Sequence, residues 1–183
     1  MKQKRRRLTA RSKWAWHQIV ILDKALTARL TLSERARLRR KGATLGAHLG
    51  DTILWLPLGL VALILGGAAL REVVVISTLA AATSAGSVTL VKPLLRRKRP
   101  QAVMGRFFWK RFDRYSFPSG HAARTASIVV VLGANYPYYA PPLYLLPLIV
   151  GLSRVALGIH YISDILVGLA IGLLFSWVIV SFI

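Results

Sequence analysis

Two histidines and one aspartate are spaced along the chain in a way that could support covalent catalysis. His160 and Asp164 stand four positions apart, so they share one face if the segment is helical. A carboxylate bonded to one imidazole nitrogen fixes the tautomer and makes the other nitrogen a better nucleophile. His121 comes from another part of the chain and could act as a separate proton donor and acceptor. Such a set indicates nucleophilic catalysis.

Fixed positive charges accompany these groups. Lys92 and Arg99 lie in the segment KPLLRRKRP, and Arg154 comes six positions before His160. Both residue types supply several hydrogen-bond donors, and the planar fork of arginine matches the oxygens of a phosphate. The three residues therefore predict an anion pocket.

The two residues just before His121 suit the same anion pocket. Ser119 offers a hydroxyl group, and Gly120 lets the backbone approach a ligand without a Cβ atom. If a helix begins near Ser119, its N–H groups and the positive end of its dipole also face the ligand. The expected ligand is a phosphoryl group.

Carboxylates are too few and too scattered to suggest a metal site. The chain has six of them: Asp23, Glu34, Asp51, Glu72, Asp113 and Asp164. No pair has the spacing of metal ligands, and two-metal phosphatases depend on carboxylate-held ions. Phosphoryl transfer depends largely on positioning and charge stabilisation. The sequence thus favours a mechanism without a metal or other cofactor, in which lysine and arginine take the place of the ion.

The elements that position these residues read as membrane helices. Hydrophobic residues make up 55% of the 183 residues, and the mean hydropathy is +0.51. A span of about 20 apolar residues matches the hydrocarbon thickness of a bilayer. The net charge of +20 would also suit nucleic-acid binding, but the uncharged spans favour an all-α, polytopic membrane bundle without nucleic acid. Five crossings are expected, at about 52–70, 73–91, 119–134, 143–157 and 160–183.

The N-terminal part divides from this bundle at residue 50. Residues 1–50 are predicted to form a basic tail and an amphipathic helix, and residues 51–183 the transmembrane domain. The helix is expected at 19–30, with an apolar stripe of Ile19, Leu22, Leu26 and Leu30. Two alternatives stay open, a helix in the membrane interface and a helix that covers the end of the bundle. Residues 33–41 are expected to be a charged connector.

The distribution of basic residues predicts the orientation. Five crossings place the N-terminus, the 92–117 loop, the start of the third crossing and the 153–160 junction on one side. Residues 1–50 hold 14 lysines and arginines and residues 92–117 hold 9, whereas the opposite side has little besides Arg71. The positive-inside rule therefore predicts an inner-membrane protein with its N-terminus and active site in the cytoplasm.

Several other polar residues receive a structural interpretation. Arg96, Arg97 and Lys98 are interpreted as cytoplasmic anchors in preference to headgroup contacts. Arg124 could line the pocket or extend to the interface. His17 and His48 are expected to be non-catalytic. The pair His48 and Asp51 is set aside because no anion-binding group accompanies it in the sequence.

Three segments resemble the signature motifs of the type 2 phosphatidic acid phosphatase family. They are K-x6-RP at 92–100, PSGH at 118–121 and SR-x5-H-x3-D at 153–164. The resemblance covers roughly residues 51–183, and all three motifs have intact spacing and the family's order. The superfamily also includes bacterial acid phosphatases and vanadium haloperoxidases.

The resemblance implies a role for each matching residue. His160 would attack phosphorus and form a phosphohistidine, Asp164 would orient it, and His121 would protonate the leaving alkoxide and later activate water. The phosphoryl oxygens would be held by Lys92, Arg99, Ser119, Gly120 and Arg154. Many members have six crossings, whereas here the short amphipathic stretch replaces the first one. This departure agrees with a cytoplasmic site.

The expected function is hydrolysis of a lipid phosphate monoester or diphosphate that enters from the bilayer. Phosphatidic acid, phosphatidylglycerophosphate and polyprenyl mono- or diphosphates are the candidates, and the sequence does not choose among them. Three alternatives stay open. They are a phosphotransferase or vanadate-dependent peroxidase on the same fold, a relic without activity, and a scaffold that binds anionic lipid or nucleic acid through residues 1–41. The sequence gives no indication of oligomeric state.

Overall fold

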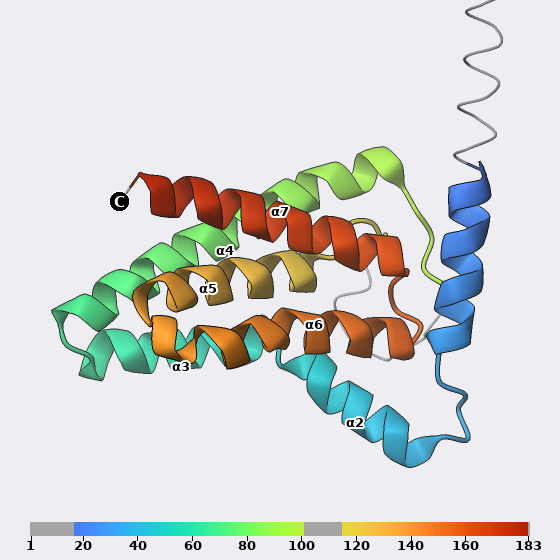
Figure 1. Ribbon diagram of the computed structural model, residues 1–183, viewed down its shortest axis with the longest axis horizontal. Coiled ribbons are helices and arrows are strands. Elements are labelled where there is room, and N and C mark those ends of the chain that lie inside the picture. Colours follow the sequence, from blue (N-terminus) through green and yellow to red (C-terminus); the bar gives the residue numbers. More distant parts are fainter. Residues whose placement is uncertain (1–16, 101–114, 183) are drawn as a thin grey trace, which may run out of the picture.

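The computed structural model describes residues 17–100 and 115–182 and shows a bundle of helices (Figure 1). The first helix occupies residues 17–30. The elements after it are α2 (Arg37–His48), α3 (Thr52–Leu65), α4 (Ala68–Leu95), α5 (Gly120–Asn135), the 3₁₀ helix η2 (Pro137–Tyr139), α6 (Ala140–Ala156) and α7 (Ile162–Ser181). Helices α3 to α7 run lengthwise, and the helix at 17–30 stands across one end of them. The described ranges contain no strand, so the all-α class is confirmed.

Helix α5 forms the centre of the bundle, because it packs against α4, α6 and α7. Glycines on α7 allow a close approach to α5. A Cβ atom added at Gly168 or Gly172 would collide with the backbone carbonyls of Ser119 and Ala123 on α5. Small residues four positions apart are the usual means by which membrane helices come together. The same contact fixes the start of α5 against the start of α7.

Large apolar side chains cover the outside of the bundle. Helix α3 has no buried residue, and Ile53 and Ile64 on it are well exposed. Leu166, Leu173 and Trp177 on α7 are exposed in the same way. An apolar surface of this extent is unusual for a soluble monomer, and a bilayer would solvate it. This surface agrees with the predicted membrane protein.

Three helices of the described residues are long and apolar enough to cross a membrane. They are Ala68–Leu95, Pro137–Ala156 and Ile162–Ser181. Helices α2 and α3 pass together as a fourth candidate, with a bend of 44° between them. Helix α5 has 16 residues and lies at the centre of the bundle. The described residues thus give three or four candidate spans, and the count of five stays a prediction.

The first two expected crossings, 52–70 and 73–91, meet at a different place from that predicted. The turn lies at residues 66–67, both glycine, whereas it was expected at residues 71–72. Two adjacent glycines end a helix more strongly than one pair of charges does. Residues 71–72 instead lie in the opening turns of α4, which extends to Leu95.

The interpretation of residues 33–41 as a connector is wrong in part, because α2 begins at Arg37. Gly46 and Ala47 are the buried residues of this helix, which packs on α6. Gly46 lies against the side chain of Ser153 so closely that a Cβ atom would not fit. Helix α2 is therefore held by a tertiary contact that the run of charges does not predict.

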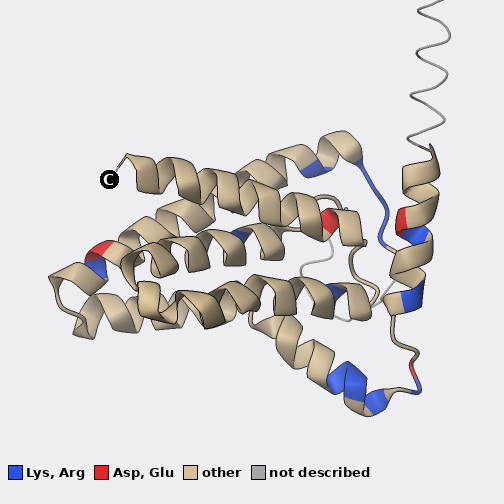
Figure 2. Cartoon of the chain, in the orientation of Figure 1, with Lys and Arg blue, Asp and Glu red and all other residues tan. Residues whose placement is uncertain are grey.

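Charged residues gather at one end of the bundle (Figure 2). This end holds the helix at 17–30, α2, the last turn of α4 and the beginnings of α5 and α7. At the opposite end, beside the turn between α3 and α4, the described charges are Arg71 and Glu72. Within the described residues, the helix at 17–30, the two ends of the loop after α4 and the α6–α7 junction share one end, as expected.

The helix at 17–30 is attached to that end through polar side chains. Asp23 and Thr27 are buried, whereas Leu22 and Leu26 of the predicted stripe are exposed. Thr27 Oγ1 accepts from the N–H of Ile162 at 3.2 Å, and Asp23 accepts from the N–H and hydroxyl of Ser163 at 3.1 and 2.6 Å. Residues 162 and 163 open α7, where N–H groups have no partner within the helix. The helix at 17–30 therefore caps α7 and covers the end of the bundle.

Candidate active site

The turn between α6 and α7 presents the first histidine. Gly158 has a φ of 70°, which an L side chain rarely adopts, so the chain can reverse there. The N–H groups of Ile159 and His160 both donate to the carbonyl of Arg154, at 3.0 and 3.4 Å. His160 therefore lies at the entrance of α7, held to the end of α6.

His160 and Asp164 form a hydrogen-bonded pair as predicted, although they do not share a helix face, because His160 precedes α7. Nδ1 of His160 lies 3.3 Å from Oδ2 of Asp164, and the two side chains are 1% and 0% exposed. Asp164 also accepts from the N–H of Tyr161 at 2.8 Å, as a carboxylate in the first turn of a helix does. Because a carboxylate can only accept, the shared proton belongs to Nδ1, and Nε2 keeps its lone pair.

Arg97 completes the surroundings of that carboxylate. It donates to Oδ1 of Asp164 at 2.8 Å and to Asp23 at 2.5 Å, and its guanidinium lies 3.9 Å from the centre of the Tyr161 ring. The preferred interpretation of Arg97 as an anchor is wrong, since it is bonded into the site. Arg97 connects the N-terminal helix to the partner of His160.

The beginning of α5 lies directly beside this group. The N–H of Ser119 donates to the carbonyl of Asp164 at 2.9 Å, which joins the starts of α5 and α7. Ser119 is buried, and its hydroxyl oxygen accepts from the N–H of Ala122 as the N-cap of α5. A Cβ atom at Gly120 would meet only Val88, at 3.6 Å, so packing does not require glycine there. An open backbone at Gly120 is consistent with the approach of a ligand.

His121 has a carboxylate partner that the sequence analysis sets aside. Nε2 of His121 lies 2.8 Å from Oδ1 of Asp51, which also accepts from Arg154 at 3.2 Å. The other oxygen, Oδ2, lies 2.6 Å from Nδ1 of His48. The premise that no anion-binding group accompanies Asp51 is therefore wrong. Although burial alone would raise the pKa of Asp51, the hydrogen bonds from His121 and His48 hold it well below its usual range.

The basic residues of the motifs lie at the same end. Arg99 donates to the carbonyl of Ile159 at 3.1 Å, next to His160, and Arg154 is buried at the end of α6. Lys92 lies in the last turn of α4. Burial lowers the pKa of His160 to about 4, and the charges of Arg99 and Arg154 add to this effect against the hydrogen bond of Asp164. His160 is therefore a neutral imidazole at neutral pH.

The remaining candidates have local roles. Arg124 donates to the carbonyl of Gly50 and so supports the segment that leads to Asp51. Arg96 is the left-handed C-cap of α4, with a φ of 48°, and donates to the carbonyl of Pro93. His17 lies at the start of the described chain and is exposed.

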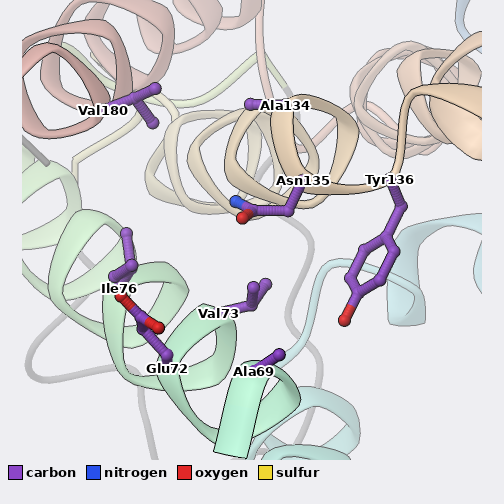
Figure 3. A pocket seen from close by; sticks show the side chains of 8 residues that line it. All are labelled: Ala69, Glu72, Val73, Ile76, Ala134, Asn135, Tyr136 and Val180. Carbon is purple, nitrogen blue, oxygen red and sulfur yellow. The ribbon is translucent and has the colours of Figure 1, made fainter.

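A pocket of about 380 Å³ lies at the other end of the bundle (Figure 3). Its lining combines aliphatic side chains with Glu72, Asn135 and Tyr136, from the beginning of α4 and the end of α5. No lysine or arginine lines it. It therefore lacks the charge that a phosphate needs and lies away from both histidines.

Three residues of this network escape prediction from the sequence: Asp23, Asp51 and Arg97. Asp51 stands at the start of an uncharged run, so its N-cap position could have been recognised from the sequence. Its pairing with His121, 70 positions away, has no local signal. Arg97 and Asp23 are likewise joined only by the fold.

The chain matches known proteins over most of its length. Residues 72–183 match the model of the PAP2 superfamily. The decaprenylphosphoryl-5-phosphoribose phosphatase of Mycobacterium tuberculosis (strain ATCC 25618 / H37Rv) is 34% identical over 127 residues, which are 69% of this chain and 70% of that protein. The lipid A 1-phosphatase of Rhizobium johnstonii is 33% identical over 48% of this chain and 38% of that protein.

Two solved structures share the fold. A transmembrane PAP2-type phosphatidylglycerolphosphate phosphatase from Bacillus subtilis superposes with a TM-score of 0.71, at 25% identity over 90% of this chain and 86% of that one. LpxE from Aquifex aeolicus gives 0.69, at 25% identity over 86% and 93%. With this sequence match, this fold and phosphatases among its relatives, the chain belongs to the PAP2 superfamily and is a membrane lipid phosphatase.

Proposed function

We propose that this phosphatase works through a phosphohistidine formed at His160. The observation that carries the proposal is the buried pair in which Asp164 holds Nδ1 of His160 at 3.3 Å. That bond leaves Nε2 as the nucleophile, and burial keeps the ring neutral. A neutral, oriented imidazole is what nucleophilic attack on phosphorus requires.

The reaction divides into two balanced steps. Nε2 of His160 attacks phosphorus, so the P–N bond forms and the P–O bond to the lipid breaks. His121 gives its proton to the leaving oxygen, and the lipid departs as an alcohol. Water then attacks phosphorus while His121 takes one of its protons. The P–N bond breaks, inorganic phosphate leaves, and both histidines return to their starting states.

Positive charge from the chain itself would stabilise the phosphoryl oxygens. Lys92, Arg99 and Arg154 lie at the same end as His160, and the start of α5 adds Ser119 and Gly120. Within the described residues no group of three or more histidine, cysteine, aspartate or glutamate side chains could hold a metal ion. The proposed mechanism therefore assigns charge stabilisation to lysine, arginine and backbone N–H groups.

The proposed substrate is a phosphate monoester or diphosphate of a membrane lipid. The relatives and structural neighbours are named for a decaprenylphosphoryl-5-phosphoribose, for lipid A and for phosphatidylglycerolphosphate. These lipids differ in their tails and share a phosphate close to the membrane surface. The common chemistry supports a lipid phosphate, and a substrate panel must decide among polyprenyl, glycerolipid and saccharolipid examples.

We further propose that α3 to α7 each cross the inner membrane, with the site on the cytoplasmic face and the helix at 17–30 in the interface. The gathering of basic residues at the site end supports this orientation. The chain has no cysteine, so single cysteines can report the side. Leu38→Cys in α2 and Tyr138→Cys in η2 replace exposed side chains at opposite ends. An impermeant maleimide added to intact cells should label only Tyr138→Cys. Labelling of Leu38→Cys alone would show that the protein has the opposite orientation.

The catalytic proposal is tested by phosphate release from the lipid panel in detergent with EDTA present. Wild type should release phosphate and, when quenched early, retain acid-labile ³²P on the protein. His160→Ala should do neither. Loss of release with EDTA would show that a metal takes part. Release by His160→Ala would place the nucleophile elsewhere.

A further inference from the structure

His121 has its own carboxylate, Asp51, supplied by the junction between α2 and α3. Asp51 lies just before α3, and its Oδ1 is 2.8 Å from Nε2 of His121. The two side chains are 23% and 24% exposed, so the pair lies at the edge of the protein interior. Asp51 lies outside all three signature motifs, which begin at Lys92.

The local role that its position suggests does not account for Asp51. It is the N-cap residue of α3, where an aspartate usually accepts a hydrogen bond from the first turn of its own helix. Its side chain makes no such bond. Instead it accepts from Arg154 and lies within hydrogen-bond distance of His121 and His48. The carboxylate is thus directed at the site and away from the helix it precedes.

We propose that Asp51 is the positioning residue of His121. Because a carboxylate can only accept, Nε2 of His121 carries the proton of their hydrogen bond, and Nδ1 becomes the nitrogen that exchanges protons with the reaction. Nδ1–H donates to the leaving oxygen in the first step, and Nδ1 takes a proton from water in the second. Asp51 stays ionised throughout. This inference rests on the proposed two-histidine mechanism.

Charge supports the same assignment. His121 must carry a positive charge before it can protonate the leaving oxygen. Burial opposes that state, and so does the positive charge of Arg154 and Arg124, from α6 and α5. Asp51 is the carboxylate that faces it, and its charge offsets theirs. His48 holds the second oxygen of Asp51 at 2.6 Å and so fixes the orientation of the carboxylate.

A different role for Asp51 would give the opposite kinetics. Its bond to Arg154 could mean that the carboxylate occupies the place of a phosphate oxygen and competes with the substrate. Removal of Asp51 would then lower KM and leave kcat unchanged or raised. A positioning residue has the reverse signature, because its removal lowers kcat and leaves KM nearly unchanged.

The kinetic test compares Asp51→Asn and Asp51→Ala with wild type on a lipid phosphate and on p-nitrophenyl phosphate. We expect kcat on the lipid to fall about 100-fold, within the range of acid–base contributions. The nitrophenolate group leaves without a proton, so its first-turnover burst should survive in the Asp51 variants and in His121→Ala. It should vanish in His160→Ala. Loss of the burst in the Asp51 variants, or a fall in KM, would overturn the proposal.

A second measurement is independent of catalysis. The protein is labelled with ¹⁵N-histidine in detergent at about pH 8, above the ordinary histidine pKa, and the His121 signal is assigned by its loss in His121→Gln. Wild type should show the Nε2–H form, and Asp51→Ala should shift towards a mixture of the two forms. Identical His121 signals in both proteins would contradict the proposal even if no substrate had been found.

The matched control is Glu72→Gln, which removes a carboxylate at the opposite end of the bundle. It should leave the kinetics and the His121 signal unchanged. If wild type released no phosphate from any lipid while the NMR difference persisted, the proposed function would fail and the pairing would stand. If wild type were active and Asp51→Ala showed neither effect, the pairing would fail and the proposed function would stand.

Discussion

The two histidine–carboxylate pairs of this site differ in the sequence separation of their members and in the solvent exposure of their side chains. His160 and Asp164 belong to one turn of chain and are 1% and 0% exposed, whereas His121 and Asp51 are 70 positions apart and are 24% and 23% exposed. A nucleophile benefits from a dry surrounding that keeps it neutral. A group that passes protons to and from water must remain accessible. The difference in burial therefore matches the proposed division of labour.

The pairs also differ in what holds each carboxylate. The second oxygen of Asp164 is bound by the guanidinium of Arg97, and that of Asp51 lies against the imidazole of His48. Arg97 is in turn bonded to Asp23 of the N-terminal helix. The first pair is thus supported by Arg97 and Asp23, and the second by Arg154 and one exposed imidazole.

The largest expected effect comes from neutralising the carboxylate of the buried pair. Asp164→Asn keeps the volume and allows the amide to donate to His160, so the proton moves to Nε2 and the nucleophile is lost. We expect phosphoenzyme formation to fall about 10⁴-fold, the size seen for a triad aspartate. Quenched-flow capture of ³²P-protein measures it directly.

The same change at Asp51 should affect a different step of the reaction. Asp51→Asn should spare phosphoenzyme formation from p-nitrophenyl phosphate and slow its breakdown, because water activation needs His121. Equal effects of the two substitutions on formation would mean that the pairs do not divide the work.

Arg97 comes next in expected size. Arg97→Ala removes charged hydrogen bonds to Asp164 and Asp23, each worth about 1.5 to 3 kcal/mol. We expect kcat to fall at least about tenfold while KM changes little, since Arg97 acts on the substrate only through Asp164. The control is Arg96→Ala, which removes an exposed neighbour bonded to its own helix. A large rise in KM in Arg97→Ala alone would show that Arg97 binds the phosphate itself.

Features that depend on local spacing or on composition could be predicted from the sequence. The spacing of His160 and Asp164 predicts their pairing, but as neighbours on one helical turn. His160 in fact precedes α7 and meets Asp164 across the start of that helix, and Gly158 marks the reversal before them. The length of the uncharged runs predicts membrane helices. The distribution of lysine and arginine predicts which end of the bundle carries the charge.

Contacts between distant segments could not be predicted in this way. The pairing of Asp51 with His121 depends on how the α2–α3 junction lies against the start of α5, and no periodicity in a single segment encodes that contact. Arg97 stands in a run of basic residues whose members look alike, and only the fold turns one of them towards Asp164. Helix α2 escaped prediction for a related reason, since the contact of Gly46 with Ser153 holds it.

A smaller effect is expected from the N-terminal helix. Asp23→Asn weakens one charged partner of Arg97 and keeps an acceptor for Ser163. We expect kcat to fall only severalfold, because Arg97 retains its bond to Asp164. The clearer readout is hydrogen exchange at residues 17–30, which should become faster as the helix detaches from α7. Unchanged exchange would mean that the contacts of Thr27 and of residues 31 and 32 hold the helix without Asp23.

The smallest effect should come from His48, which lies outside the second pair and contacts Oδ2 of Asp51. His48 is 66% exposed, and Gln can still donate a hydrogen bond to Asp51. Because exposed pairs of this kind contribute about 1 kcal/mol or less, His48→Gln should change kcat by no more than about fivefold on the lipid phosphate. A loss as large as that of Asp51→Ala would mean that His48 itself exchanges protons with the reaction. The second pair would then be a relay of two imidazoles across one carboxylate.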